Sequence, residues 1–244
     1  MSVDLRGNVA VITGASRGIG RATALALARE GVNVVLAART AEDLETLREE
    51  VEALGVKALP VPCDVSQEAD VARLKQAALD AFEQVDILVN NAGVGRYATI
   101  LDTTPEEYDW MMDTNMRSTF LCTRAFLPEM VERGSGSIIT VSSQAGYYGY
   151  GGEAVYVATK FAQIGFCQAL DNEVREKGVK VSIIAPGSTR THFAFGTGRE
   201  EGEPRLEKML DAGDVAEAVV YAAKQPPNTR ILVVGMRAMF EPVF

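Results

Sequence analysis

The sequence has 244 residues, of which 47% are hydrophobic, and a formal net charge of −9 at pH 7. This apolar fraction is enough for a sizeable core and argues against disorder, and the length suits a single α/β domain. A net negative surface repels nucleic acid and anionic membranes, so we expect neither as a partner.

The termini and the cysteines narrow the class of protein further. The amino-terminal segment lacks the apolar core of a signal peptide, and no uninterrupted apolar stretch is long enough to span a bilayer, so we expect a cytoplasmic protein. Cys63, Cys122 and Cys167 are odd in number and widely spaced, which predicts buried free thiols. The single histidine, His192, leaves few nitrogen ligands, so no metal site is expected.

Short β-branched runs alternate with longer amphipathic segments along the chain. In chain order, they predict a strand at 9–13, a helix at 21–30, a strand at 32–37, a helix at 41–54, a strand at 58–62, a helix at 67–82, a strand at 87–90, a long helical region at 105–133, a strand at 137–142, a helix at 156–177, a strand at 179–185, a helix at 214–224 and a last strand at 230–234. Nearly continuous apolar strands indicate burial on both faces. This pattern predicts a three-layer, doubly wound parallel sheet of the Rossmann type in one domain, residues 1–244. The weakest order is expected at about residues 193–205, where glycines lie among charges.

A glycine-rich turn separates the first strand from the first helix. Its spacing is Gly-x-x-x-Gly-x-Gly, and its candidate cofactor-binding residues are Gly14, Ser16, Arg17, Gly18, Ile19 and Gly20. Glycines let the backbone approach a pyrophosphate closely, and a helix amino terminus supplies amide donors. Alone, this turn is a weak signal, and the alternative explanation is a tight structural turn.

The end of the second strand indicates which dinucleotide is bound. NAD sites usually carry an acid there for the ribose 2′-hydroxyl, whereas this stretch reads Ala37-Ala38-Arg39-Thr40. The guanidiniums of Arg17 and Arg39 would bind a 2′-phosphate, which a carboxylate would repel. The alternative is that both arginines are merely solvated. The residues favour NADP(H) over NAD(H).

Tyr156 and Lys160 are spaced for one face of a helix, so the ammonium would lie near the phenol. A nearby cation favours the phenolate and lowers the tyrosine pKa. Alone, such a pair is common by chance and is usually structural.

The combination of motifs is far more specific. The glycine loop, Asn90-Asn91-Ala92-Gly93, Asn115, Ser143, the Tyr156/Lys160 pair and Pro186-Gly187 with Thr191 occur in one order over about residues 4–234. In this set the chain resembles the short-chain dehydrogenase/reductase family. The resemblance implies that Tyr156 is the acid/base and that Ser143, rather than Ser142, hydrogen-bonds the same substrate oxygen. It also implies that Lys160 tunes Tyr156 and binds the nicotinamide ribose, and that Asn115 helps hold a water linking Lys160 to solvent.

The resemblance extends to further cofactor contacts. Asp64 and Val65 are expected at the adenine, and Asn91, Ala92 and Gly93 beside the adenosine ribose. Pro186, Gly187, Thr189 and Thr191 are expected at the nicotinamide, where they would fix the geometry of hydride transfer.

The substrate is expected between residues 144–153 and 193–204. Tyr147, Tyr148 and Tyr150 would form an aromatic wall there, or pack at a subunit interface. The glycine-rich residues 195–202 could close over the substrate as a lid, and their shortness favours a small or extended substrate. His192 is interpreted as a surface or cap histidine. The resemblance implies a homotetramer or homodimer that pairs helices 105–133 and 156–177, although the carboxyl-terminal tail departs from the common pattern.

These features predict an oxidoreductase that transfers a hydride between NADP(H) and a carbonyl or secondary alcohol substrate. The chief alternative is a 3-oxoacyl-[acyl-carrier-protein] reductase, which would use Arg96, Arg117, Arg124 and Arg133 to meet an acidic carrier; a mixed-charge helix face explains those arginines equally well. A non-catalytic NADP(H)-sensing protein is a third possibility, opposed by the complete set of Asn115, Ser143, Tyr156 and Lys160.

Overall fold

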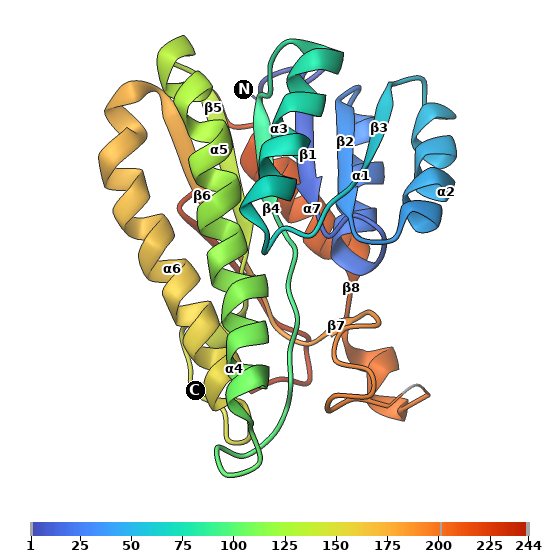
Figure 1. Ribbon diagram of the computed structural model, residues 1–244, viewed down its shortest axis with the longest axis vertical. Helices are drawn as coiled ribbons and strands as arrows, with labels where there is room; N and C mark the ends of the chain where they lie inside the picture. The colour runs from blue at the N-terminus through green and yellow to red at the C-terminus, as the bar shows by residue number, and fades with distance from the viewer. Residues whose placement is uncertain (1, 201, 243–244) are drawn as a thin grey trace.

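A computed structural model describes residues 2–200 and 202–242, and its centre is a seven-stranded parallel sheet. The strand order is β3-β2-β1-β4-β5-β6-β9 (Figure 1). The strands are β1 (Val9–Thr13), β2 (Asn33–Ala38), β3 (Ala58–Pro62), β4 (Ile87–Asn90), β5 (Gly136–Val141), β6 (Val179–Pro186) and β9 (Val233–Met236). All residues of β1 and β4 are buried, as their continuous apolar runs predict. The doubly wound parallel sheet expected from the sequence is therefore confirmed.

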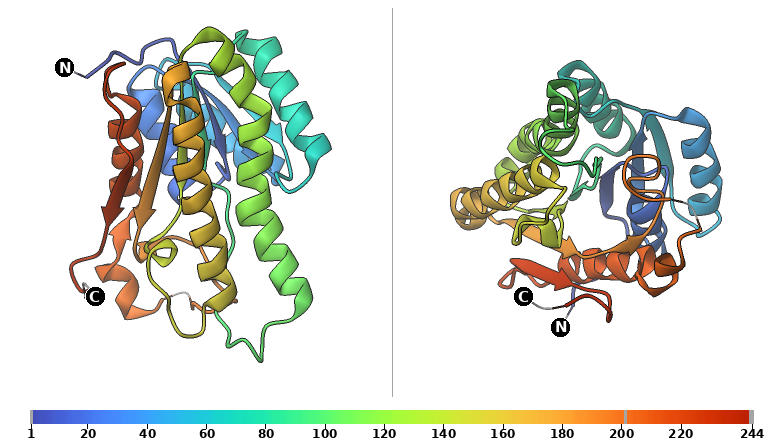
Figure 2. Two further views of the ribbon diagram at one scale, coloured as in Figure 1. Left: turned by 90° about the vertical axis from the view of Figure 1, so that its left-hand side faces the viewer. Right: turned by 90° about the horizontal axis from the view of Figure 1, so that it is seen from below.

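Helices cover both faces of the sheet and complete the three layers (Figures 1 and 2). One face packs against α1 (Gly18–Arg29), α2 (Ala41–Glu52) and α7 (Ala212–Ala223). The other face packs against α3 (Glu68–Phe82), α5 (Ser118–Arg133) and α6 (Ala154–Val174). Cys63, Cys122 and Cys167 are free and buried, as predicted.

The long helical region predicted at 105–133 is divided into three parts. Helix α4 (Pro105–Met112) begins at a capping box made by Thr104 and Glu107, and α5 follows after a π-helical turn at Asp113–Arg117. Such turns insert one residue into a helix and are frequent at functional sites. Here the turn contains Asn115, whose side chain is completely buried.

Two details of the carboxyl-terminal third differ from the expectation. The last strand lies at Val233–Met236 instead of 230–234, because β6 extends to Pro186 and its partner register carries β9 to Met236. In addition, β7 (Thr189–Arg190) and β8 (Leu210–Asp211) pair as a short parallel ribbon. This ribbon closes the base of an excursion, residues 191–209, that was predicted only as a poorly ordered segment.

The order of the strands reverses between β1 and β4, because consecutive connections run outward from there to opposite edges of the sheet. In open parallel sheets, ligands bind at such a switch point, beyond the carboxyl ends of the strands. Among the described residues, no helix is long and apolar enough to cross a membrane.

Candidate active site

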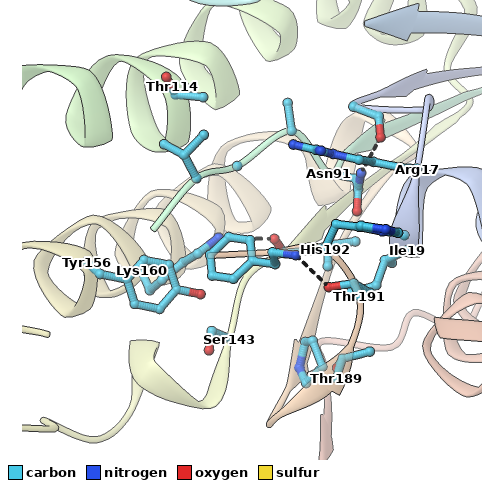
Figure 3. A pocket seen from close by; sticks show the side chains of 18 of the residues that line it. Arg17, Ile19, Asn91, Thr114, Ser143, Tyr156, Lys160, Thr189, Thr191 and His192 are labelled. Atoms are coloured by element: carbon cyan, nitrogen blue, oxygen red, sulfur yellow. Dashed lines mark hydrogen bonds between the residues drawn. The ribbon is translucent and has the colours of Figure 1, made fainter. Parts of the chain in front are cut away.

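A cavity of about 950 Å³ opens at the carboxyl ends of the central strands. It is lined by most of the residues that the sequence indicated: Gly14, Ser16, Arg17, Gly18, Ile19, Arg39, Asp64, Val65, Asn91, Ala92, Gly93, Ser143, Tyr156, Lys160, Pro186, Gly187, Thr189 and Thr191. Arg17 and Ile19 lie at one end, and Tyr156, Lys160 and Ser143 at the other (Figure 3). Gly20 and Asn115 are not part of the lining and lie buried behind it.

The glycine turn is packed too closely for larger residues. Gly14 has a φ of +65°, a conformation that favours glycine, and a Cβ on Gly20 would lie 2.2 Å from the carbonyl oxygen of Gly14. The side-chain amide of Asn91 donates to the carbonyl oxygen of Thr13 at 2.9 Å and to that of Gly14 at 3.2 Å. Asn91 therefore holds the turn in place as well as lining the cavity.

The end of the cavity beside the glycine turn carries two exposed guanidiniums and one carboxylate that already accepts hydrogen bonds. Arg17 directly precedes α1, and Arg39 follows the last residue of β2, so both project at the edge of the cavity. The Oδ1 atom of Asp64 accepts hydrogen bonds from the backbone and the hydroxyl of Ser66, at 3.0 and 2.7 Å. Asp64 thus shapes its own turn and places Val65 against the cavity.

Tyr156 lies in the first turn of α6, two residues after the helix begins, and its side chain is buried. Its hydroxyl faces the cavity on the side of Ser143 (Figure 3). Burial raises the pKa of Tyr156 above its ordinary value, Tyr97 and Glu153 add to the rise, and a hydrogen bond with Ser143 opposes it. The aromatic rings of Tyr97 and Phe193 pack against the phenol, with centroids 6.2 and 5.6 Å away.

Lys160 is buried one turn further along α6, and its Nζ lies 5.7 Å from the centre of the Tyr156 ring. Burial lowers the pKa of Lys160 to about 7. The expectation that this cation lowers the Tyr156 pKa is therefore wrong for this structure. Desolvation dominates both groups, and an ammonium that is half neutral near pH 7 is a weak source of positive potential.

Asn115 is locked by its neighbours rather than open to the cavity. Its side-chain oxygen accepts from the backbone of Val94 at 2.8 Å, and its amide nitrogen donates to the Val94 carbonyl and to the Thr159 hydroxyl, both at 2.9 Å. Its backbone carbonyl accepts from Gln163 at 2.9 Å. The side-chain oxygen of Gln163 also accepts from the Nζ atom of Lys160 at 2.9 Å, so Gln163 connects Asn115 to Lys160.

Gln163 was not predicted as a site residue. Its only sequence signal is a polar residue on the buried face of a helix, three positions after the lysine.

The loop that contains Gly187 is supported by a second unpredicted residue, Glu241. Its Oε1 atom accepts from the backbone and the hydroxyl of Ser188, at 3.0 and 2.7 Å, and its Oε2 atom accepts from the backbone of Ala238. A Cβ on Gly187 would lie 2.2 Å from this carboxylate. The carboxyl-terminal tail thus fastens the loop that contains Gly187.

The three tyrosines after Ser143 have different surroundings. Tyr150 lines the cavity, Tyr148 lies under the guanidinium of Arg237 at 5.0 Å, and Tyr147 packs against the core on the α5/α6 side of the sheet. Only one of them therefore contributes to the cavity wall.

Residues 8–201 match the short chain dehydrogenase family profile. The chain belongs to this family. Short-chain dehydrogenases are oxidoreductases, and an uncharacterized oxidoreductase, SH0585, from Staphylococcus haemolyticus is 37% identical over 234 residues, covering 96% of this chain and 98% of the relative. The chain is also 37% identical to glycine betaine reductase ATRR of Emericella nidulans, but it spans only 19% of that protein's length.

Two solved short-chain dehydrogenase structures resemble the whole chain. One is an alcohol dehydrogenase from the archaeon Thermococcus sibiricus in complex with 5-hydroxy-NADP, with a TM-score of 0.90 and 31% identity, covering 97% of this chain and 99% of that one. The other is a metagenomic short-chain oxidoreductase in complex with NADP, with a TM-score of 0.85 and 34% identity, covering 98% and 100%.

Proposed function

We propose that the protein transfers a hydride between NADP(H) and a carbonyl or secondary alcohol substrate, with Tyr156 as the general acid/base. The observation that carries this proposal is the placement of Tyr156, Ser143 and Lys160 together at one end of a cavity whose other end is the glycine turn. A proton donor for the substrate oxygen and a cradle for a dinucleotide are thus in one cavity.

In the reducing direction Tyr156 acts as the general acid. Burial raises its pKa, so the phenol holds its proton at neutral pH, and its hydroxyl faces the cavity where a carbonyl oxygen would accept that proton. Ser143 lies beside it to donate a second hydrogen bond to the same oxygen, where negative charge develops. When bound, NADPH supplies the hydride to the carbonyl carbon. In this proposal Lys160, which is connected through Gln163 to Asn115, returns a proton to the phenol.

NADP(H) is favoured over NAD(H) by the charges at the adenosine end. Arg17 and Arg39 flank the rim of the cavity, and Ala38, the last residue of β2, leaves no carboxylate at the end of that strand to repel a 2′-phosphate. The two solved neighbours bound to NADP or 5-hydroxy-NADP support the same choice.

The arginines that would contact an acyl carrier protein already form ion pairs with carboxylates of this chain. Arg96 forms an ion pair with Glu107 at 2.9 Å, and Arg124 with Glu68 at 3.1 Å. Arg117 pairs with Asp113, and Arg133 with Asp86, both at 3.7 Å. These pairs fit a mixed-charge surface, so we favour a small carbonyl substrate over a carrier-bound one.

We also propose a homotetramer or homodimer that pairs α5 and α6. Phe120 on α5 and Phe161 on α6 are 44% and 46% exposed, which leaves apolar surface for a second subunit. Two other apolar residues of α6, Ile164 and Leu170, are buried within the subunit and add no exposed apolar surface for such an interface. Of the segment expected to be flexible, about residues 193–205, the described part borders the substrate end of the cavity through Phe193, Arg199 and Arg205, and residue 201 lies outside the described residues.

The test is oxidation of NADPH in the presence of neutral ketones and aldehydes, compared between wild type and two variants. Tyr156→Phe is expected to lower turnover by about a hundredfold or more while NADPH binding, measured by its fluorescence, is retained. Tyr147→Phe is the matched control, because the Tyr147 hydroxyl has no hydrogen-bond partner among the described residues and lies outside the cavity. Turnover that survives Tyr156→Phe would contradict the proposal, and NADPH binding without turnover of any carbonyl would favour a sensing protein.

A further inference from the structure

A second group of charges lies at the substrate end of the cavity. Arg199, Arg205 and Glu153 line the same cavity as Tyr156. Arg199 belongs to the excursion between β7 and β8, whereas Glu153 directly precedes α6. Arg199 is only 8% exposed, so its charge is withdrawn from bulk water although it borders the cavity.

The guanidinium of Arg199 is held one aromatic ring away from the phenol of Tyr156. Its Cζ atom lies 5.9 Å from the ring centres of both Tyr97 and Phe193, the two rings that pack against Tyr156. Its Nη1 atom donates to the carbonyl oxygen of Thr189 at 3.1 Å. These contacts fix a cation near the position of the reacting carbonyl.

The positive charge of Arg199 lacks a close counter-ion within the described part of the chain. No carboxylate there lies within ion-pair distance of it, whereas Arg205 pairs with Glu203 at 2.5 Å. Glu153 is near enough for both arginines to lower its pKa, against a larger rise caused by burial, but it forms an ion pair with neither. A buried guanidinium without a close anion is costly, and its planar donors match a carboxylate.

We propose that Arg199 binds a carboxylate of the substrate, so that the preferred substrates are oxo acids and the corresponding hydroxy acids. The inference rests on the proposed function and names its substrate class. In the reducing direction, the carbonyl carbon gains the hydride of NADPH and the carbonyl oxygen gains the proton of Tyr156. The carboxylate remains unchanged as an anchor. The negative charge of Glu153 repels a substrate carboxylate. Binding of the carboxylate therefore depends on its contact with Arg199 and not on the summed charge of the cavity.

The first experiment compares oxo acids, with the carbonyl one to four carbons from the carboxylate, with their methyl esters as substrates of NADPH-dependent reduction. We expect the best acid to exceed its ester about tenfold or more in kcat/KM, a gain that raising the salt concentration reduces. Equal rates, or a preference for the ester in every pair, would overturn the proposal while leaving the reduction of neutral ketones intact.

Three variants then assign the effect to particular charges. Arg199→Gln is expected to remove the preference for the acid, because kcat/KM for the acid should fall about tenfold more than kcat/KM for the ester. Glu153→Gln is expected to raise the acid-to-ester ratio, because it removes a repulsive charge. Lys208→Gln is the matched control, an exposed cation of the same excursion that does not line the cavity. An acid-to-ester ratio unchanged by Arg199→Gln, with both rates falling together, would show a structural role only.

A binding measurement tests the same anion site without turnover. Calorimetric titration of the wild-type NADP⁺ complex with butanoate and with butanamide is expected to show tighter binding of the carboxylate by about tenfold. Glu153→Gln should widen that gap. Equal affinities for the two probes would overturn the proposal even if Arg199→Gln fails to fold. Turnover that survives Tyr156→Phe would instead overturn the proposed function.

Discussion

The Oε1 atom of Gln163 lies 2.9 Å from the Nζ atom of Lys160, and it provides the closest hydrogen bond described for this buried ammonium. The orientation of the amide is determined by its other end, because Nε2 donates to the Asn115 carbonyl at 2.9 Å and to the Thr119 hydroxyl at 2.8 Å. The family resemblance led us to expect that Asn115 helps hold a water that links Lys160 to solvent. In addition, the side chain of Gln163 connects Lys160 to the Asn115 carbonyl within the protein.

The hydrogen bond between Lys160 and Gln163 predicts that two substitutions of Gln163 shift the pH dependence of kcat/KM in opposite directions. Gln163→Leu removes an acceptor from the charged lysine, so the pKa of Lys160 should fall below about 7 and kcat should drop about tenfold or more. The alkaline limb of kcat/KM for ketone reduction should then move to lower pH. Gln163→Glu should move it to higher pH, because a carboxylate stabilises the ammonium. A purely structural role would leave the profile of both variants in place.

Burial of Lys160 also predicts how stability depends on pH. The folded pKa of about 7 lies below the ordinary 10.5, so between these values the unfolded chain holds a proton that the folded chain has released. The destabilisation by Lys160 is therefore complete below pH 7 and is relieved as the pH rises towards 10. Lys160→Met should be more stable than wild type at pH 6 in urea denaturation, and the difference should shrink by pH 9.5. Lys208→Met, at an exposed position outside the cavity, is the control for the loss of a lysine side chain. A Lys160→Met advantage that grows with pH would contradict the assignment.

Arg39 is predicted to determine the choice of dinucleotide. Arg39→Asp replaces a donor to the 2′-phosphate by a repulsive charge, so the ratio of kcat/KM for NADPH over NADH should fall about tenfold or more. Arg29→Asp makes the same charge change at the far end of α1, outside the cavity, and should leave the ratio unaltered. If both variants change the ratio equally, only the overall charge matters and the assignment of Arg39 fails.

The packing of the glycine turn predicts a strong effect of a single methyl group. In Gly20→Ala the new Cβ would lie 2.2 Å from the Gly14 carbonyl and 2.5 Å from the Asn91 amide, so backbone must shift. We expect a loss of about 1–3 kcal/mol in the free energy of unfolding and weaker NADPH binding. Gly213→Ala, in the first turn of α7 where nothing lies within 4 Å, should be neutral or slightly stabilising. Wild-type stability and NADPH affinity in Gly20→Ala would show that the turn is looser than described.

The arrangement of the sheet follows from local patterns in the sequence, but the break in its longest helix does not. Strands that are buried on both faces appear in the sequence as short apolar runs. Their alternation with helices predicts that neighbouring strands are parallel. The π-helical turn at Asp113–Arg117 depends instead on where Asn115 finds partners, and these are Val94 and Thr159, 21 and 44 residues away. No pattern within the helix itself encodes those contacts.

The same distinction separates the site residues that were predicted from those that were not. Tyr156, Lys160 and the glycine turn are motifs within a few residues of sequence. Gln163, Glu241 and Arg199 act through contacts with distant segments, such as the 53 residues between Ser188 and Glu241. From residue type and position alone, Gln163 would be interpreted as a buried amide, Glu241 as a charge in the carboxyl-terminal tail and Arg199 as a cation in a loop. The direction of the Tyr156 pKa was also missed, because the spacing shows a neighbouring charge but not the extent of burial.

The contact between Glu241 and Ser188 has a practical consequence for handling the protein. A fusion partner joined close to Glu241 would lie near the carboxylate that fastens the loop containing Gly187. The surroundings of Val3 are different, since its backbone bonds to the Lys224 carbonyl at the end of α7, and the first and the last described residues lie at opposite ends of the molecule (Figure 2). A tag joined near Val3 is therefore expected to leave the Gly187 loop undisturbed.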